Sequence, residues 1–147
     1  MAGHVYPDHP RVGVGAIVIQ GDKVLLIRRG APPGEGLWAP PGGGVALGET
    51  LEAAAEREVR EETGLTVNVG KAVYSFDLIE RDNAGRVRFH YVIVDFTAEV
   101  LSGTLSAGDD AEDARWFTAG ELDTIPVSKY TRTLLAAIGF AGGASPS

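Results

Sequence analysis

Residues 43–65 read GGVALGETLEAAAEREVREETGL, and this stretch predicts a helix from Leu51 to Glu62. Thr50 can accept a hydrogen bond from the first turn, and the following residues are rich in Ala, Leu, Glu and Arg, which favour helices. Gly64 is suited to the left-handed conformation that ends many helices. The stretch therefore carries its own start and stop signals.

Three carboxylates gather on one side of this predicted helix. At about 100° per residue, Glu58, Glu61 and Glu62 fall within an arc of roughly 100°. This arc continues the apolar stripe of Leu51, Ala54 and Ala55. The opposite face, predicted to be solvated, consists of Glu52, Glu56, Arg60 and Thr63.

An ordinary charged surface is the simplest interpretation, with Glu56–Arg60 and Arg57–Glu61 as pairs four residues apart. The position of the cluster on the apolar stripe argues against it, because clustered carboxylates facing the protein body are costly unless a positive charge compensates them. Arg57 can orient one carboxylate while the others bind a metal ion. Hard oxygen ligands favour Mg²⁺ or Mn²⁺.

The same residues form a longer pattern. Gly43 and Glu49 are followed by the block Arg57-Glu58-Val59-x-Glu61-Glu62-x-Gly64-Leu65. The pattern resembles the Nudix box at all nine specified positions, a match that average residue usage makes as rare as about one in a billion per start position. The segments WAPPGGG (38–44) and DDAEDARWF (109–117) also resemble those flanking the box in this family, so the resemblance covers about residues 11–138.

The resemblance implies roles for the box residues. Glu58 and Glu62 are expected to be the principal metal-binding carboxylates, assisted by Glu61, with the carbonyl of Gly42 as a further oxygen ligand. Glu49 and Arg57 are expected to orient them. Bound cations would neutralise a diphosphate and favour attack of water at phosphorus. A nucleoside diphosphate linked to a group X would then give a nucleoside monophosphate and phosphorylated X.

The general base stays open among several carboxylates. Glu61 or Glu58 can serve, and so can a group from the acidic segment 109–113. Asp110 is the first candidate there, and Glu112, which we also place at the substrate, is the second. A solvated turn before Trp116 is an equally good interpretation of this segment.

Two further kinds of residue are candidates for substrate contact. Arg28 and Arg29 alternate on a predicted strand, so at most one of them faces a phosphate group. Trp38 can stack on a nucleobase, although aromatic residues in sheets more often belong to the core.

Composition sets limits on the function. A chain of 147 residues with 44% apolar content is long enough for one domain with its own core. Cysteine is absent, which excludes disulfides and thiolate chemistry. The net charge of −7 argues against nucleic-acid partners. No apolar run reaches membrane-spanning length, so we expect a cytoplasmic protein without a membrane partner.

The remaining pattern predicts an α/β fold. Runs 12–19 and 23–29 form a hairpin, and residues 30–48 form a Gly/Pro-rich loop before the helix. Later segments favour two long strands around a turn at 82–85, a short strand at 114–117, a helical turn at 119–123 and a closing helix at 129–140. We expect an N-terminal segment (1–10), one domain (11–140) and a flexible tail (141–147). The order of elements indicates an α/β/α sandwich with a mixed sheet, as the family resemblance also implies.

The resemblance also suggests a substrate. The whole chain resembles Nudix proteins of the ADP-ribose pyrophosphatase type, which implies hydrolysis of ADP-ribose to AMP and ribose 5-phosphate and suggests a homodimer. The proline that marks the ADP-ribose subgroup is missing from residues 79–82. A nucleoside triphosphate pyrophosphohydrolase is the alternative enzyme. A non-catalytic nucleotide sensor is the alternative of another class.

Overall fold

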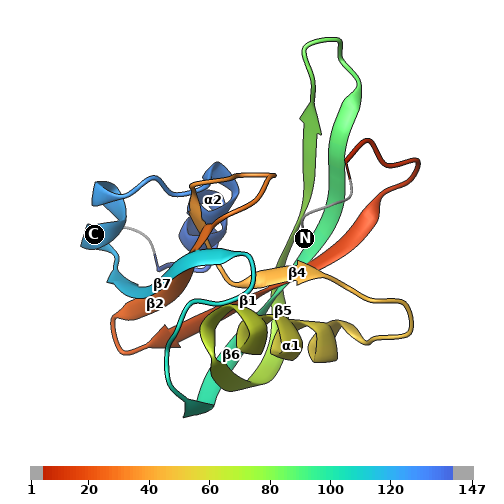
Figure 1. The fold of residues 1–147 in the computed structure, drawn as a ribbon. Coiled ribbons are helices and arrows are strands. Elements are labelled where there is room, and N and C mark those ends of the chain that lie inside the picture. The colour runs from red at the N-terminus through yellow and green to blue at the C-terminus, as the bar shows by residue number, and fades with distance from the viewer. Residues whose placement is uncertain (1–4, 141–147) are drawn as a thin grey trace.

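The computed structural model describes residues 5–140 and shows an α/β architecture (Figure 1). A mixed seven-stranded sheet has the order β3-β2-β1-β6-β5, with β4 paired to β1 and β7 paired to β2. The two α-helices lie on opposite sides of the strands, as the sandwich prediction requires (Figure 1). The strands are β1 (Arg11–Gln20), β2 (Lys23–Arg29), β3 (Trp38–Ala39), β4 (Gly42–Gly44), β5 (Leu65–Arg81), β6 (Val87–Gly103) and β7 (Ala111–Thr118).

The parallel pairing of β1 with β6 makes the sheet mixed. It runs from Arg11 opposite Tyr91 to Val18 opposite Ala98. The predicted hairpin of β1 and β2 is confirmed only at its turn, where Ile19 pairs with Val24 and Gln20 with Lys23. Beyond the turn the two strands diverge, and β2 pairs with β7 and β3 instead.

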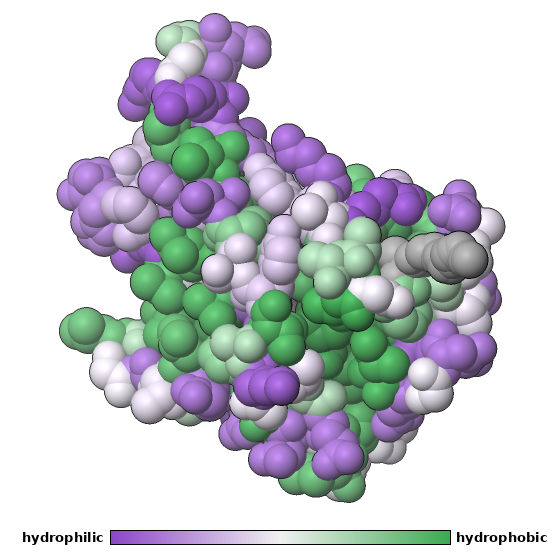
Figure 2. Space-filling view, turned by 180° about the vertical axis from the view of Figure 1, so that it is seen from behind, coloured by the Kyte–Doolittle hydropathy of each residue, from purple (hydrophilic) through white to green (hydrophobic). Residues whose placement is uncertain are grey.

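The long strands β5 and β6 form an antiparallel hairpin that projects from the body (Figure 1). Its turn lies at the predicted place and is held by Asp82, whose Oδ1 accepts hydrogen bonds from the backbone N–H groups of Ala84 and Arg86, each at 2.9 Å. From behind, apolar side chains gather over the middle of the molecule, below the polar tip of the hairpin (Figure 2).

Helix α1 (Leu51–Thr63) confirms the helix prediction and both of its ends. The Thr50 hydroxyl oxygen accepts a hydrogen bond from the Ala53 N–H at 3.1 Å, and Gly64 is left-handed with φ 75°. The prediction that Thr63 is solvated was wrong. Thr63 is fully buried, and its hydroxyl donates to the Val59 carbonyl at 2.6 Å, which satisfies the polar group inside the core.

The predicted loop at 30–48 contains two short strands, and glycine explains why β4 was not expected. The sequence Gly42-Gly43-Gly44 has weak strand propensity, yet it pairs with residues 13–15 of β1. A Cβ at Gly42 would lie 2.1 Å from the Val14 carbonyl oxygen, so only glycine allows this close backbone approach.

The last elements agree with the prediction apart from their ends. They are β7, the 3₁₀ helix η1 (Gly120–Thr124) and the helix α2 (Lys129–Ala137). The predicted flexible tail at 141–147 lies outside the described residues. Within residues 5–140, no helix is both long and apolar enough to cross a membrane.

Apolar cores form on both faces of the sheet. On one face, Ala54 and Ala55 of α1 pack with Val14 and Phe96. On the other, a cluster of Leu78, Phe89, Tyr91 and Ile93 packs with Phe76 and with Tyr130 of α2. Because side chains alternate along a strand, Phe96 points to α1 whereas Ile93 and Asp95 of β6 point to the α2 side.

Candidate active site

The guanidinium of Arg57 joins the loop before α1 to the acidic side of that helix. Its Nε and Nη2 donate to the two carboxylate oxygens of Glu49 at 2.7 and 2.9 Å, and Nη2 also donates to the Gly44 carbonyl at 3.0 Å. Its Nη1 donates to Glu58 at 2.9 Å and to Glu61 at 3.1 Å. These bonds hold the pKa of Glu49 at about 2. The geometry is compatible with the orienting role, which stays a prediction.

Glu58 is buried between α1 and β4. Burial raises the pKa of its carboxyl, and the hydrogen bond from Arg57 opposes this rise. A Cβ at Gly43 would lie 2.4 Å from the Glu58 carboxyl carbon. The glycine therefore provides the space in which this carboxylate lies.

Glu62 is the most deeply buried carboxylate of the helix, with 3% of its surface exposed. Its Oε1 accepts a hydrogen bond from the Gly42 N–H at 2.9 Å. Burial raises the pKa of Glu62 to about 8, and the nearby charge of Glu58 adds to the rise. Such a group ionises readily near neutral pH only when a cation compensates it.

Asp109 is the acidic partner that the helix pattern did not reveal. Carboxylate oxygens of Glu58, Glu61 and Asp109 all lie within 4.8 Å of one another. Asp109 has a positive φ of 53°, which is uncommon outside glycine and aims the side chain from the turn before β7. The sequence showed that segment 109–113 is acidic, but which of its carboxylates reaches Glu58 and Glu61 depends on the conformation of this turn.

The two candidates named from the sequence, Asp110 and Glu112, lie in different surroundings. The backbone carbonyl of Asp110 accepts a hydrogen bond from the Gly30 N–H at 2.8 Å, and its carboxylate interacts electrostatically with Arg29. Glu112 is exposed and accepts a hydrogen bond from the Arg28 Nε at 3.2 Å. Asp110 thus stays a candidate near the site, while Glu112 is engaged on the surface.

The carboxylates fit a divalent cation. Glu58 is buried, whereas Glu61 and Asp109 are exposed. Like charges this close repel one another unless a cation lies among them, and all the donors are hard oxygen atoms of the kind Mg²⁺ and Mn²⁺ prefer. Glu58, Glu61 and Asp109 are the residues of this cluster that would hold it. Glu62, whose Oε1 accepts the hydrogen bond from the Gly42 N–H, stays a predicted ligand. The Gly42 carbonyl stays a predicted further ligand.

The alternating arginines of β2 are separated as expected. Arg29 is half-buried, lines a cavity and donates from Nη2 to the Ala31 carbonyl at 3.3 Å. It also lies close enough to Glu62 for the two charges to interact. Arg28 faces away, in its ion pair with Glu112. Of these two arginines, Arg29 is the one that lines the cavity. Arg28 and Glu112 pair with each other outside that lining, and their contact with substrate stays a prediction.

Trp38 is a core residue. Only 4% of its surface is exposed, and its ring meets that of Phe117 edge to face at a centroid distance of 4.9 Å. It packs in the cluster under η1 and α2. Its ring has no free face for a nucleobase, which corrects the prediction that Trp38 stacks on substrate.

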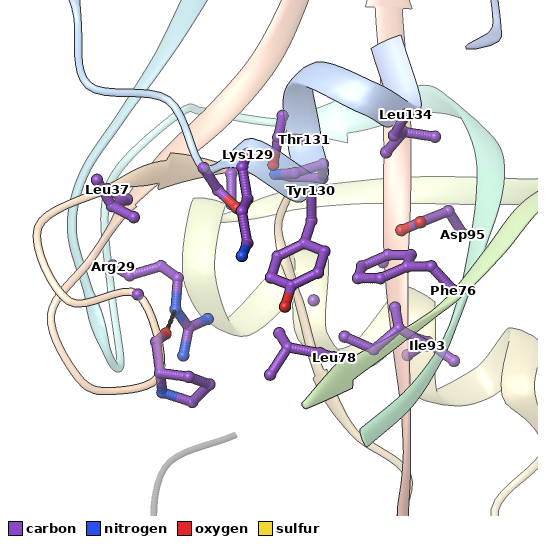
Figure 3. A pocket seen from close by; sticks show the side chains of 18 of the residues that line it. Arg29, Leu37, Phe76, Leu78, Ile93, Asp95, Lys129, Tyr130, Thr131 and Leu134 are labelled. Carbon is purple, nitrogen blue, oxygen red and sulfur yellow. Dashed lines mark hydrogen bonds between the residues drawn. The ribbon is translucent and has the colours of Figure 1, made fainter. Parts of the chain in front are cut away.

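A cavity of about 290 Å³ lies between the sheet and α2, next to the carboxylates. In Figure 3, Arg29 and Lys129 occupy one side of it and Asp95 the other, with Tyr130 and Phe76 between them. The rings of Phe76 and Tyr130 are stacked at 5.2 Å and 20°. Gly42 lines this cavity and also donates to Glu62, so the cavity and the carboxylate site share a wall.

Comparison with known families agrees with this geometry. The family model described as NUDIX domain matches residues 9–137. The chain belongs to the NUDIX domain family. The nine-position match at residues 43–65 is therefore a true Nudix box, and its conformation here is a loop, a short strand and helix α1.

Among its Nudix relatives, the chain is 40% identical to an ADP-ribose pyrophosphatase of Methanocaldococcus jannaschii, over 78% of this chain and 65% of the relative. It is 34% identical to an oxidized purine nucleoside triphosphate hydrolase of Danio rerio, over 77% and 67%. The chain thus spans about two thirds of the length of these two relatives. A solved MutT NUDIX hydrolase from Burkholderia pseudomallei is 31% identical, with a TM-score of 0.72 over 89% of this chain and 99% of that one.

The buried Nudix carboxylates give the metal-free protein a defined pH dependence. Because the pKa of folded Glu62 is raised to about 8, its contribution to stability is full below the unfolded pKa near 4.5 and is lost as pH rises through about 8. We expect the free energy of unfolding in EDTA to fall by up to about 5 kcal/mol over this range, since one pKa unit corresponds to about 1.4 kcal/mol. Thermal melting from about pH 5 to about pH 9 measures this.

The glutamine variant Glu62→Gln provides the control for that measurement. It lacks the titrating carboxyl and should show a flatter pH profile than the wild type. Added Mg²⁺ should raise Tm most at high pH, where the carboxylates are ionised. A wild-type Tm that is constant or rises toward pH 9 in EDTA would contradict the prediction.

Proposed function

We propose that this chain is a metal-dependent hydrolase that cleaves ADP-ribose to AMP and ribose 5-phosphate. The observation that carries the proposal is the position of Gly42. Its N–H donates to Glu62 of the box, and the same residue lines the cavity whose aromatic and cationic side chains suit a nucleotide. The 40% identity to a relative named ADP-ribose pyrophosphatase supports the choice of substrate.

The reaction is a hydrolysis at phosphorus. The oxygen of a water molecule forms a bond to one phosphorus atom, the bridging P–O bond breaks, and the bridging oxygen leaves with the other phosphate. A bound divalent cation would neutralise the diphosphate and make the water more acidic. Arg29 would bind a phosphate oxygen, because it lines the cavity and is close enough to Glu62 for their charges to interact. Arg57 would keep Glu58 and Glu61 in place.

A carboxylate must accept the proton that the water releases. Asp109 joins the candidates for this role, because it lies within 4.8 Å of oxygens of Glu58 and Glu61. Asp110, Glu58 and Glu61 stay candidates for this role. The positive φ of Asp109 is a strained conformation of the kind that clusters at functional sites.

The cavity suits a nucleobase. Its lining is mainly apolar, and stacking of a base on an aromatic ring contributes about 1–3 kcal/mol. Phe76 and Tyr130 supply such rings from β5 and α2. Arg29 and Lys129 lie where the phosphates of a bound nucleotide would leave the cavity (Figure 3).

A side-by-side assay tests the substrate. The purified chain is given Mg²⁺ and either ADP-ribose or each nucleoside triphosphate, and products are resolved by ion-exchange chromatography. We expect kcat/KM for ADP-ribose to exceed every triphosphate by at least about tenfold, a difference of about 1.4 kcal/mol in the barrier. The control contains EDTA in place of Mg²⁺ and should show no turnover.

The other outcomes decide between the alternatives. A tenfold preference for triphosphates would replace the proposed substrate with the pyrophosphohydrolase alternative, which the Danio rerio relative supports. Binding of ADP-ribose without any turnover would support a nucleotide sensor. The homodimer and the cytoplasmic location stay predictions that rest on the family resemblance and on composition.

A further inference from the structure

Asp95 is an acidic residue in an apolar environment. It lies in the middle of β6, its surface is 3% exposed, and it lines the cavity between the sheet and α2. Among residues 5–140, its Oδ2 has no hydrogen-bond partner. In Figure 3 its carboxyl points toward the interior of the cavity. A buried polar atom without a partner is costly, so its presence calls for an explanation.

The neighbouring strand makes room for this carboxyl. Gly15 of β1 lies directly beside Asp95 in the parallel register, and a Cβ at Gly15 would come within 2.2 Å of Asp95 Oδ1. The neighbours of Asp95 in β6, Val94 and Phe96, are apolar. The chain therefore combines a buried acid with the one residue type that leaves it space.

The labelled side chains of the cavity change from cationic to aromatic to acidic in Figure 3, although Glu80 also lines the cavity and interacts with Arg29. Arg29 and Lys129 lie on one side, the stacked rings of Tyr130 and Phe76 in the middle, and Asp95 on the far side (Figure 3). A nucleotide has the same order of chemistry: phosphates, a flat base, and the polar edge of that base. The orientation puts the edge of the base at Asp95.

We propose that Asp95 is the specificity-determining residue of this cavity, hydrogen-bonding the polar edge of the purine whose phosphates lie toward Arg29. The inference rests on the proposed function only in taking a nucleotide as the occupant. It applies equally to ADP-ribose and to a triphosphate, so it can be tested apart from the choice of substrate.

The protonation state of Asp95 decides which purine it accepts. A neutral carboxyl has one donor and one acceptor, which match N1 and the 6-amino group of adenine. An ionised carboxylate has acceptors only, which match the N1–H and 2-amino group of guanine but repel N1 of adenine. Burial raises the pKa of Asp95 to about 7, so the neutral form is available near neutral pH.

The other charged groups of the cavity do not set this pKa. Arg29, Glu80 and Lys129 line the same space with the phenol of Tyr130, whereas the β1 residues beside Asp95, Val14 and Gly15, are uncharged. Within the described part of the chain, burial is the one resolved cause of the raised pKa. A variant at position 95 leaves all of these groups unchanged and so isolates the carboxyl.

Titrations with AMP and GMP in EDTA, followed by NMR, test the proposal without turnover. The two ligands carry the same phosphate. Protonation of that phosphate or of Glu62 therefore changes both Kd values by the same factor and leaves their ratio unchanged. In the wild type, Kd(AMP)/Kd(GMP) should rise at least about tenfold between about pH 6 and about pH 8.5. In Asp95→Asn, whose amide keeps one donor and one acceptor at every pH, the ratio should stay constant.

A second variant separates recognition from a structural role. Asp95→Leu removes the carboxyl and should weaken both nucleotides about tenfold or more by leaving the base edge unpaired. Because it also removes a buried unpaired carboxyl, it should melt at a higher temperature than the wild type at alkaline pH. Loss of binding together with a higher Tm is the pattern that a merely structural Asp95 would not give.

Three results would overturn the inference: a wild-type ratio independent of pH, unchanged binding in Asp95→Leu, or no binding of either nucleotide. Failure of the proposed function looks different. A wild type that does not hydrolyse ADP-ribose but shows the pH-dependent ratio keeps the role of Asp95 and loses only the proposed substrate.

Discussion

Replacing Glu62 with glutamine is expected to lower Mg²⁺-dependent hydrolysis more than about 100-fold, beyond the usual effect of residues that only support a metal ligand. Glutamine keeps the volume of the side chain and can still accept the hydrogen bond from the Gly42 N–H, so the packing of α1 is preserved. The substitution removes the negative charge of a residue that has only 3% of its surface exposed. Steady-state kinetics with ADP-ribose at several Mg²⁺ concentrations measures the loss.

Glu52→Gln is the matched control, because it makes the same chemical change on the same helix. Glu52 lies in the first turn and is exposed, so its substitution should change kcat/KM less than about twofold. The Glu62 variant should also be at least as stable as the wild type in EDTA, since it no longer contains a carboxyl whose pKa burial raises. Unchanged turnover and Mg²⁺ dependence in Glu62→Gln would refute the metal-binding role.

Helix α1 could be predicted residue by residue because its determinants are local. The cap at Thr50, the left-handed Gly64 and the apolar stripe are all contained in one segment of sequence. The buried positions of Glu58 and Glu62 followed from the helical period alone. Thr63 did not follow, since its burial depends on a hydroxyl bond to the preceding turn.

Features fixed by long-range pairing were harder to predict. The sequence could say that one of Arg28 and Arg29 faces the site, but not which one, and β2 is irregular against β7 at this point. Asp109 joins Glu58 and Glu61 only because the turn before β7 brings residue 109 to the C-terminal half of α1. That turn also donates the Gly108 N–H to the Glu62 carbonyl at 3.1 Å.

Asp95 is a further residue whose position the sequence could not predict, because it depends on long-range pairing. Its segment VIVDF has the composition of a buried strand, and one acidic residue in it carries no motif. Its place opposite Gly15 depends on the parallel pairing of β1 with β6, which joins positions 80 residues apart. Trp38 was misplaced for a related reason, because its burial depends on elements that come 80 to 100 residues later in the chain.

Arg57 is the second residue whose replacement should have a large effect, and here the expected loss combines activity with stability. Arg57→Lys keeps a positive charge but loses the planar fork that binds both oxygens of Glu49 and reaches Glu58 and the Gly44 carbonyl. We expect kcat/KM to fall about 10- to 100-fold, the usual effect of a residue that orients metal ligands. The free energy of unfolding should fall by about 2 kcal/mol, less than for a fully buried pair because the side chain is 27% exposed.

Arg60→Lys, on the exposed face of the same helix, is the matched control and should change neither quantity measurably. Urea unfolding gives the stability of both variants, and kinetics with ADP-ribose gives their activity. If positive charge alone were needed to offset the glutamates, Arg57→Lys would behave like the control. A large loss in Arg57→Lys beside an unaffected Arg60→Lys would instead show that the directed bonds to Glu49 and Glu58 hold the carboxylates in position for the cation.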